Sequence, residues 1–282
     1  MRGVLRRHWP EYLIEAAGLG LFMLSACAFG TLLGHPASPV VRDALPDPFI
    51  RRVFMGLCMG LTAIGLIYSP WGQRSGAHFN PAITLTFWRL GKVASADAAY
   101  YAVAQTAGAL AGVLVAASIL GELVAHPSVR YVVTLPGPAG APGAFAGEFA
   151  ITFVLMIVVL RASNTARLAR FTGLFAGALV AIYITVEAPI SGMSMNPARS
   201  LASAVPAHVW TALWIYLIAP PLGMFLAAEA YVRRQGIARV FCAKLHHDNT
   251  QRCIFHCRYA EMRAFPRPAV PGPEPAPVGS RT

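Results

Sequence analysis

The chain has 282 residues, of which 56% are hydrophobic and only 12% charged, and its mean hydropathy is +0.54. A soluble domain carries roughly 25% charged residues, so this composition argues against a soluble enzyme and for a membrane protein. The formal net charge is +11, but the basic residues avoid the apolar runs and lie in short connections and near the C-terminus. That distribution is typical of charges that orient membrane helices, and we expect no nucleic-acid partner.

Six apolar stretches approach the length of about 20 residues that a transmembrane helix needs. They cover residues 12–33, 50–69, 97–120, 144–160, 171–188 and 209–231. Two shorter apolar pieces, residues 81–90 and 197–205, are too short to cross a bilayer, and each directly follows an asparagine. The pattern predicts an all-α membrane protein with six transmembrane helices and two half-helices.

Basic residues mark one side of these spans. They lie before the first span, between spans two and three, between spans four and five, and after the sixth: Arg2, Arg6, Arg7, Arg74, Arg89, Lys92, Arg161, Arg167, Arg170 and nine Lys or Arg from Arg233 onward. Cytoplasmic loops carry such an excess, although Arg42, Arg51 and Arg52 depart from the rule. We expect a multi-pass protein of the cell (inner) membrane with both termini in the cytoplasm.

The chain repeats itself. SGAHFNPAITL at residues 75–85 and SGMSMNPARSL at residues 191–201 agree at six of eleven positions. Each copy follows the second span of its half, and three spans per half make the two halves enter the membrane in opposite directions. The sequence therefore predicts an inverted 3+3 repeat, with halves of about residues 1–120 and 140–232.

The shared Asn-Pro-Ala motif indicates how a pore can form. Asn80 and Asn196 are suited to cap a helix N-terminus, and Pro81 and Pro197 suit the first helical turn; Ala82 and Ala198 complete the two motifs. Two oppositely inserted half-helices bring their positive dipole ends and two amide N–H donors to the membrane midplane. Such a site favours neutral solutes and opposes protons and cations.

With these motifs the sequence resembles the major intrinsic protein family, the aquaporins and glycerol facilitators, over about residues 11–232. The resemblance implies an aquaporin-like channel domain at residues 1–232, a pore in each chain, and a homotetramer among membrane lipids. It implies no cofactor. It matches Arg199 to the arginine of the outer constriction, and it gives the intramembrane Glu15 and Glu148 a structural role, tying down loop backbone behind the pore.

The resemblance also places the other constriction residues. Counting backward from Asn196 gives Ile184 and Met193, and the position on span two falls at Met59 or Gly60. Water-selective members resemble one another in carrying an aromatic residue and a histidine there, and this chain has neither. An apolar mouth lowers the cost of admitting carbon-bearing solutes. Ser200, however, stands where glycerol facilitators resemble one another in an aspartate, so the solute stays open.

Two further groups have competing interpretations. His78 lies two residues before Asn80 and either lines the pore or is a buried, hydrogen-bonded loop histidine. The segment 233–282 is expected to be a basic cytoplasmic tail outside the membrane core, with a disordered Pro-rich end at 266–282. Its candidate metal ligands are Cys242, His246, Cys253 and Cys257; reduced cytoplasmic cysteines without a metal are the alternative.

The function predicted from these features is a passive channel for water or small uncharged solutes such as glycerol, urea or ammonia. The alternative is a secondary transporter, because inverted repeats with broken helices occur there too. Ion coupling usually needs several intramembrane ionisable groups, whereas only Glu15, Glu148 and Arg199 lie clearly within the membrane core. We therefore favour the channel and expect no enzyme activity.

Overall fold

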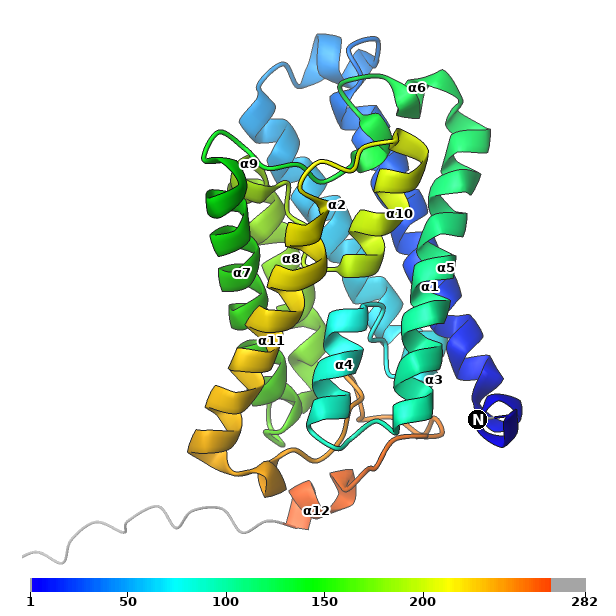
Figure 1. Cartoon of the computed structure of the whole chain (residues 1–282), viewed down its shortest axis with the longest axis vertical. Helices are drawn as coiled ribbons and strands as arrows, with labels where there is room; N and C mark the ends of the chain where they lie inside the picture. The colour runs from blue at the N-terminus through cyan, green and yellow to red at the C-terminus, as the bar shows by residue number, and fades with distance from the viewer. Residues whose placement is uncertain (1, 265–282) are drawn as a thin grey trace, which may run out of the picture.

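A computed structural model describes residues 2–264 of the chain (Figure 1), and the regular structure in that range is entirely helical. Six helices are long and apolar enough to cross a membrane. In the described range they are α1 (Arg2–Gly34), α2 (Pro48–Tyr68), α5 (Ser95–Leu120), α7 (Gly140–Ser163), α8 (Thr172–Val186, with the preceding turn Ala169–Phe171) and α11 (Leu213–Gln235). The prediction of six spans is confirmed.

The spans differ from their expected bounds mainly at the ends. Helix α1 begins at Arg2 rather than at residue 12, because its polar first turns continue the same helix beyond the apolar stretch. Helix α8 ends at Val186, and the separate turn α9 (Ala188–Ser191) follows it. At the start of α2 the Asp47 carboxylate caps the backbone N–H groups of Phe49 and Ile50.

Close approach of backbones holds the long helices in pairs. Helices α1 and α5 lie side by side (Figure 1), and a Cβ atom on Gly112 of α5 would fall 2.1 Å from the carbonyl oxygen of Gly20 on α1. Helices α2 and α8 make the same kind of contact through Gly60 and Gly177. Without a hydrophobic driving force inside lipid, contacts between small residues supply the dispersion attraction that holds such pairs.

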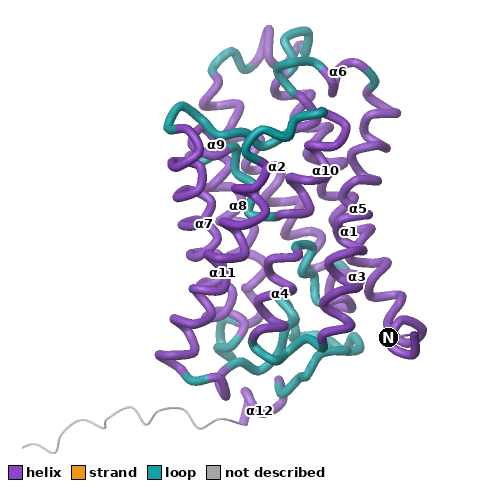
Figure 2. Tube along the Cα trace, viewed as in Figure 1, coloured by secondary structure: helices purple, strands orange, loops and turns teal. Residues whose placement is uncertain are grey.

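The two half-helices enter the bundle from opposite ends. Helix α4 (Pro81–Arg89) occupies the half that holds the N-terminus, and α10 (Pro197–Ala207) occupies the other half (Figure 1). We call the end of the bundle that holds the N-terminus and α4 the tail end. We call the opposite end, which holds α10 and the connections before α2 and before α7, the loop end. Figure 2 shows the two non-helical segments that run inside the bundle toward the half-helices, as an inverted repeat requires.

The residues after α11 return across the tail end. A short turn (Ile237–Arg239) leads into residues 240–258, which form no regular structure, and then into α12 (Tyr259–Ala264). Residues 240–245 are all buried, so this part of the expected tail is packed against the helix bundle and does not stand apart from it. The Pro-rich residues 266–282 lie outside the described part of the chain.

Candidate functional site

The loop before α4 is held by one buried carboxylate. Glu15 on α1 accepts hydrogen bonds from the backbone N–H groups of His78 (3.1 Å) and Phe79 (2.6 Å) and from the side chains of Ser75 (2.6 Å) and Gln105 (2.8 Å). Four donors compensate the cost of burying a charge within the bundle. They fix a loop in which Phe79 has a φ of +45°. Residues other than glycine rarely adopt this backbone conformation.

The loop before α10 repeats this arrangement. Glu148 on α7 accepts hydrogen bonds from the backbone N–H groups of Ser194 (2.6 Å) and Met195 (2.7 Å) and from the Ser191 hydroxyl (2.8 Å). Met195 has a φ of +55°, the counterpart of Phe79. The two loops are thus held by equivalent carboxylates on the first helix of each half, and both Glu15 and Glu148 contact loop backbone.

The two motif asparagines join the loops across the centre of the molecule. The Asn80 Oδ1 accepts from the backbone N–H of Ala82, and the Asn196 Oδ1 accepts from the N–H groups of Ala198 and Arg199, so each caps its own half-helix. Each amide nitrogen also donates to a carbonyl oxygen of the opposite loop. This uses one N–H of each amide group and leaves the second for another acceptor. The proline of each motif occupies the first turn of its half-helix.

A cavity of about 320 Å³ runs past this centre. Its wall includes residues from the loop end, such as Arg52 and Val133, the two asparagines, and residues from the tail end, such as Ile67 and Leu245. Arg52, His78, Asn80, Ser194, Asn196 and Arg199 are its polar lining residues, and the remainder are apolar or glycine. The geometry is a mostly apolar passage with hydrogen-bonding groups at a few places.

The structure separates the residues expected at the constriction into cavity-lining residues and one that faces a neighbouring helix. Met59, Ile184, Met193 and Arg199 all line the cavity. Gly60 does not, because it faces α8, where a Cβ atom would fall 2.6 Å from the carbonyl oxygen of Gly177. Of the two alternatives on span two, the structure therefore places Met59 on the cavity wall and Gly60 at a helix contact.

Arg199 brings an unused donor to the cavity. Its backbone N–H is part of the α10 cap, while its buried Nη1 has no hydrogen-bond partner within the described residues. A buried guanidinium N–H that is left unpaired costs free energy. A neutral solute with an acceptor oxygen can satisfy this N–H at the constriction, and the fixed positive charge opposes a cation.

His78 lines the cavity and is also fully hydrogen-bonded. Its Nε2 lies 2.8 Å from the carbonyl oxygen of Ala243 and its Nδ1 lies 3.0 Å from the Thr84 hydroxyl. Since a carbonyl oxygen only accepts, the network assigns the proton to Nε2. The ring is stacked between Phe87 and Phe255, with centroid distances of 5.4 and 5.2 Å. Both interpretations of His78 therefore hold, and its two nitrogens are occupied by protein.

The tail contributes residues that the sequence reasoning did not find. Leu245 lines the cavity at the tail end, and its backbone N–H donates to the carbonyl oxygen of Gly76. Among the candidate metal ligands, Cys242, Cys253 and Cys257 lie together with His247. His246 points elsewhere, with its ring against Tyr68 at 4.8 Å, which corrects the expected donor set.

Three comparisons with known proteins agree on the kind of molecule. A family model described as Major intrinsic protein matches residues 7–231. A probable NIP-type aquaporin from Nicotiana alata is 36% identical over 182 residues, which cover 63% of this chain and 65% of that relative. Aquaporin NIP1-2 from Arabidopsis thaliana is 33% identical over 225 residues, covering 78% of this chain and 72% of the relative.

The chain spans less than two thirds of the length of several such relatives, for example 63% of aquaporin NIP1-4 from Oryza sativa subsp. japonica. An X-ray structure of the aquaglyceroporin from Plasmodium falciparum superposes with a TM-score of 0.66 at 21% identity, covering 79% of this chain and 95% of that one. At this identity the likeness concerns the fold.

Proposed function

Because the chain belongs to the major intrinsic protein family, we propose that it is a passive transmembrane channel for water and small uncharged solutes. The observation that carries the proposal is the cavity that passes both motif asparagines. A passing oxygen atom can accept from the second amide N–H of Asn80 and of Asn196, which replaces part of its hydration at the centre of the cavity.

The same centre opposes ions. Each half-helix directs its positive N-terminal end at the cavity, and Arg199 adds a full positive charge toward the loop end. A cation meets unfavourable potential from three sources, and few lining groups can replace its hydration shell. The cavity therefore suits neutral solutes and excludes protons and cations.

The constriction suits solutes that are larger and less polar than water. Met59, Ile184 and Met193 contribute apolar surface to the cavity that Arg199 also lines, so CH groups can pass against apolar side chains while an oxygen accepts from the guanidinium. We propose glycerol and urea as permeants alongside water.

The chain is an integral membrane protein with several spans, and we extend this to its orientation and assembly. The excess of basic residues on the tail-end side of the spans supports a cytoplasmic location of both termini in a cell (inner) membrane, by the positive-inside rule. Exposed apolar side chains such as Leu61, Val103 and Ile119 on the long helices supply surface for lipid or for neighbouring chains. We propose a homotetramer with one pore in each chain, as the family resemblance implies.

Light scattering of proteoliposomes tests the function. Vesicles that contain the purified chain, and protein-free vesicles, are challenged separately with sucrose, glycerol and urea. The proposal expects water efflux with sucrose and faster re-swelling than in empty vesicles with glycerol and urea, with no dependence on proton or sodium gradients. Accumulation of a solute above its external concentration under either gradient would instead identify a secondary transporter, and vesicles no more permeable than empty ones would refute both.

A further inference from the structure

The segment at residues 240–258 is buried although no helix or sheet holds it. Residues 240–245 are all buried, including Lys244 with 1% of its surface exposed. An irregular segment pays the full backbone entropy of ordering without the repeated hydrogen bonds of regular structure. Small irregular units of this kind usually depend on a disulfide or a metal ion.

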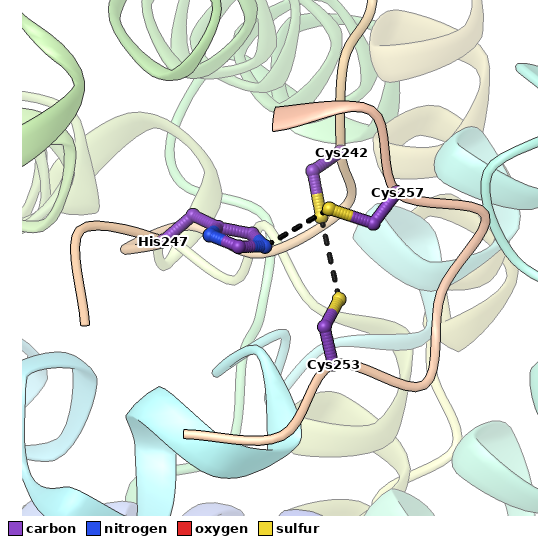
Figure 3. Close-up of side chains that lie close together, drawn as sticks. All are labelled: Cys242, His247, Cys253 and Cys257. Carbon is purple, nitrogen blue, oxygen red and sulfur yellow. Dashed lines mark hydrogen bonds between the residues drawn. The ribbon is translucent and has the colours of Figure 1, made fainter. Parts of the chain in front are cut away.

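Four donor atoms converge within this segment. Cys242, His247, Cys253 and Cys257 each direct one atom toward a common point (Figure 3), and these atoms all lie within 4.8 Å of one another. The Sγ atoms of Cys242 and Cys253 are 3.6 Å apart, and the Cys257 Sγ is 3.0 Å from the His247 Nε2. Ligands at Zn–S and Zn–N lengths in a tetrahedral site stand about 3.7 Å apart. The donors already have close to that spacing.

The surroundings suit a thiolate-bound cation. The backbone N–H of Tyr259 points at the Cys257 sulfur at 3.4 Å, and the Tyr259 ring stacks on His247 with a centroid distance of 4.2 Å. The buried Lys244 lies two residues from Cys242, and its Nζ donates to the carbonyl oxygen of Gln251 at 3.0 Å.

We propose that Cys242, His247, Cys253 and Cys257 bind one zinc ion that folds residues 240–258 onto the tail end of the bundle. Three sulfurs and one imidazole are the donor set of structural zinc, and four protein ligands leave no open position for a substrate. The ion therefore has a structural role. It links two stretches, 242–247 and 253–257, that share few backbone hydrogen bonds.

The folded segment reaches the cavity. Ala243 accepts the His78 hydrogen bond, Leu245 lines the cavity wall, and Phe255 stacks on the other face of His78. Each of these three residues lies within two positions of a proposed zinc ligand in sequence. The consequence for conduction rests on the proposed function, whereas the metal site itself does not, so metal content and flux are measured separately.

The test measures metal in the full-length chain, purified in detergent with a thiol reductant and with an affinity tag that contains no histidine. After loading with zinc and removal of unbound ion, we expect about one zinc per chain, and less than about a tenth of that in Cys253→Ser/Cys257→Ser. Cobalt(II) added to the metal-free chain should give the absorption of a tetrahedral thiolate complex in the wild type and not in this variant.

Matched variants separate a site from adventitious binding. Cys27→Ser/Cys58→Ser removes two cysteines outside the cluster and should keep the zinc. His246→Asn should keep it and His247→Asn should lose it, although the two histidines are neighbours. Gel filtration and the thermal unfolding profile of the helix bundle show that each variant is folded. Wild-type protein without zinc after loading, equal zinc content in the two histidine variants, or a Cys242–Cys253 disulfide in the reduced preparation would overturn the proposal.

Discussion

The amide nitrogen of Asn80 donates a hydrogen bond of 2.8 Å to the backbone carbonyl oxygen of Met195, on the loop that enters from the opposite end of the molecule. Its counterpart Asn196 donates an equal bond to the carbonyl oxygen of Phe79. The sequence predicts only that each asparagine caps the half-helix that follows it. The carboxamide oxygens do cap their own half-helices, but the nitrogens cross over, so the loops stabilise one another.

Asn80→Asp and Asn196→Asp each test this crossed pair. The substitution removes the donor, places a carboxylate oxygen against a carbonyl oxygen, and adds a buried charge. We expect the free energy of unfolding to fall by about 2–4 kcal/mol. We expect solute flux per folded chain to fall at least about tenfold, for which a barrier increase of about 1.4 kcal/mol suffices.

Thermal unfolding in detergent and stopped-flow light scattering measure the two effects. Gln73→Glu is the matched control, because its amide also donates to a backbone carbonyl, that of Tyr68, but lies outside the cavity lining. It should leave flux unchanged. Wild-type flux and stability in both asparagine variants would show that the crossed bonds do not matter.

Glu15→Gln and Glu148→Gln should both destabilise the loops. Both oxygens of each carboxylate accept hydrogen bonds from N–H groups of the loop. An amide NH₂ in place of one oxygen therefore faces another donor and leaves a buried N–H unpaired. We expect a loss of about 2–4 kcal/mol in the free energy of unfolding for each. Glu229→Gln is the control, because its pair with Arg89 is exposed and worth about 0–1 kcal/mol. Similar melting temperatures for all three variants would contradict the anchoring role.

The central motifs could be predicted because local chemistry specifies them. An Asn-Pro pair starts a helix wherever it stands, and its recurrence at residues 80 and 196 with three spans per half indicates the inverted arrangement. Local chemistry does not decide which of two adjacent residues on span two lines the cavity. Met59 and Gly60 are separated by about 100° around one helix, so an uncertainty of one residue exchanges the cavity wall for the α8 contact.

In the tail, too, the sequence does not distinguish between neighbouring residues. His246 and His247 are adjacent in an irregular segment, and composition does not say which ring turns toward the cysteines; only the packing of His246 on Tyr68 separates them. Leu245 could not be assigned to the cavity from sequence either. Its position depends on long-range hydrogen bonds from the tail to the loop at Gly76 and to His78.

Arg199→Val tests the positive barrier at the constriction. Removal of the guanidinium leaves the half-helix dipoles but takes away the nearest full charge, so we expect proton leakage to increase several-fold while neutral solutes continue to pass. A pH-sensitive dye inside proteoliposomes measures the leak. Arg42→Val, at an exposed pair with Asp43 on the loop end, is the control and should change nothing. An unchanged leak in Arg199→Val would assign proton exclusion to the half-helices alone.

Ile184→His tests the apolar wall of the constriction. A histidine there narrows the passage and adds a polar group to the cavity that Arg199 also lines, so glycerol and urea flux should decrease more than water flux. Ile182→His is the matched control, because Ile182 is two residues away on the same helix and 52% exposed on the outer surface. If Ile184→His leaves the ratio of solute to water permeability unchanged, residue 184 does not belong to the filter.

Removal of zinc tests whether the folded tail segment restricts the tail-end mouth. Leu245 lines the cavity there, and the segment around it is joined to the pore loop by the bonds at Gly76 and His78. Without the ion, the entropy of the released segment favours its departure from the mouth. We therefore expect Cys253→Ser/Cys257→Ser to conduct glycerol faster than the wild type, by about two- to tenfold, corresponding to about 0.4–1.4 kcal/mol in the barrier.

Deletion of residues 240–282 should conduct glycerol at least as fast, because the six spans and two half-helices are complete without them. Cys27→Ser/Cys58→Ser is the control in the same vesicles. Equal glycerol flux in the wild type and in the zinc-free variant, with metal loss verified, would show that the segment leaves the mouth open, whereas loss of conduction in the deletion would mean that the tail stabilises the pore itself.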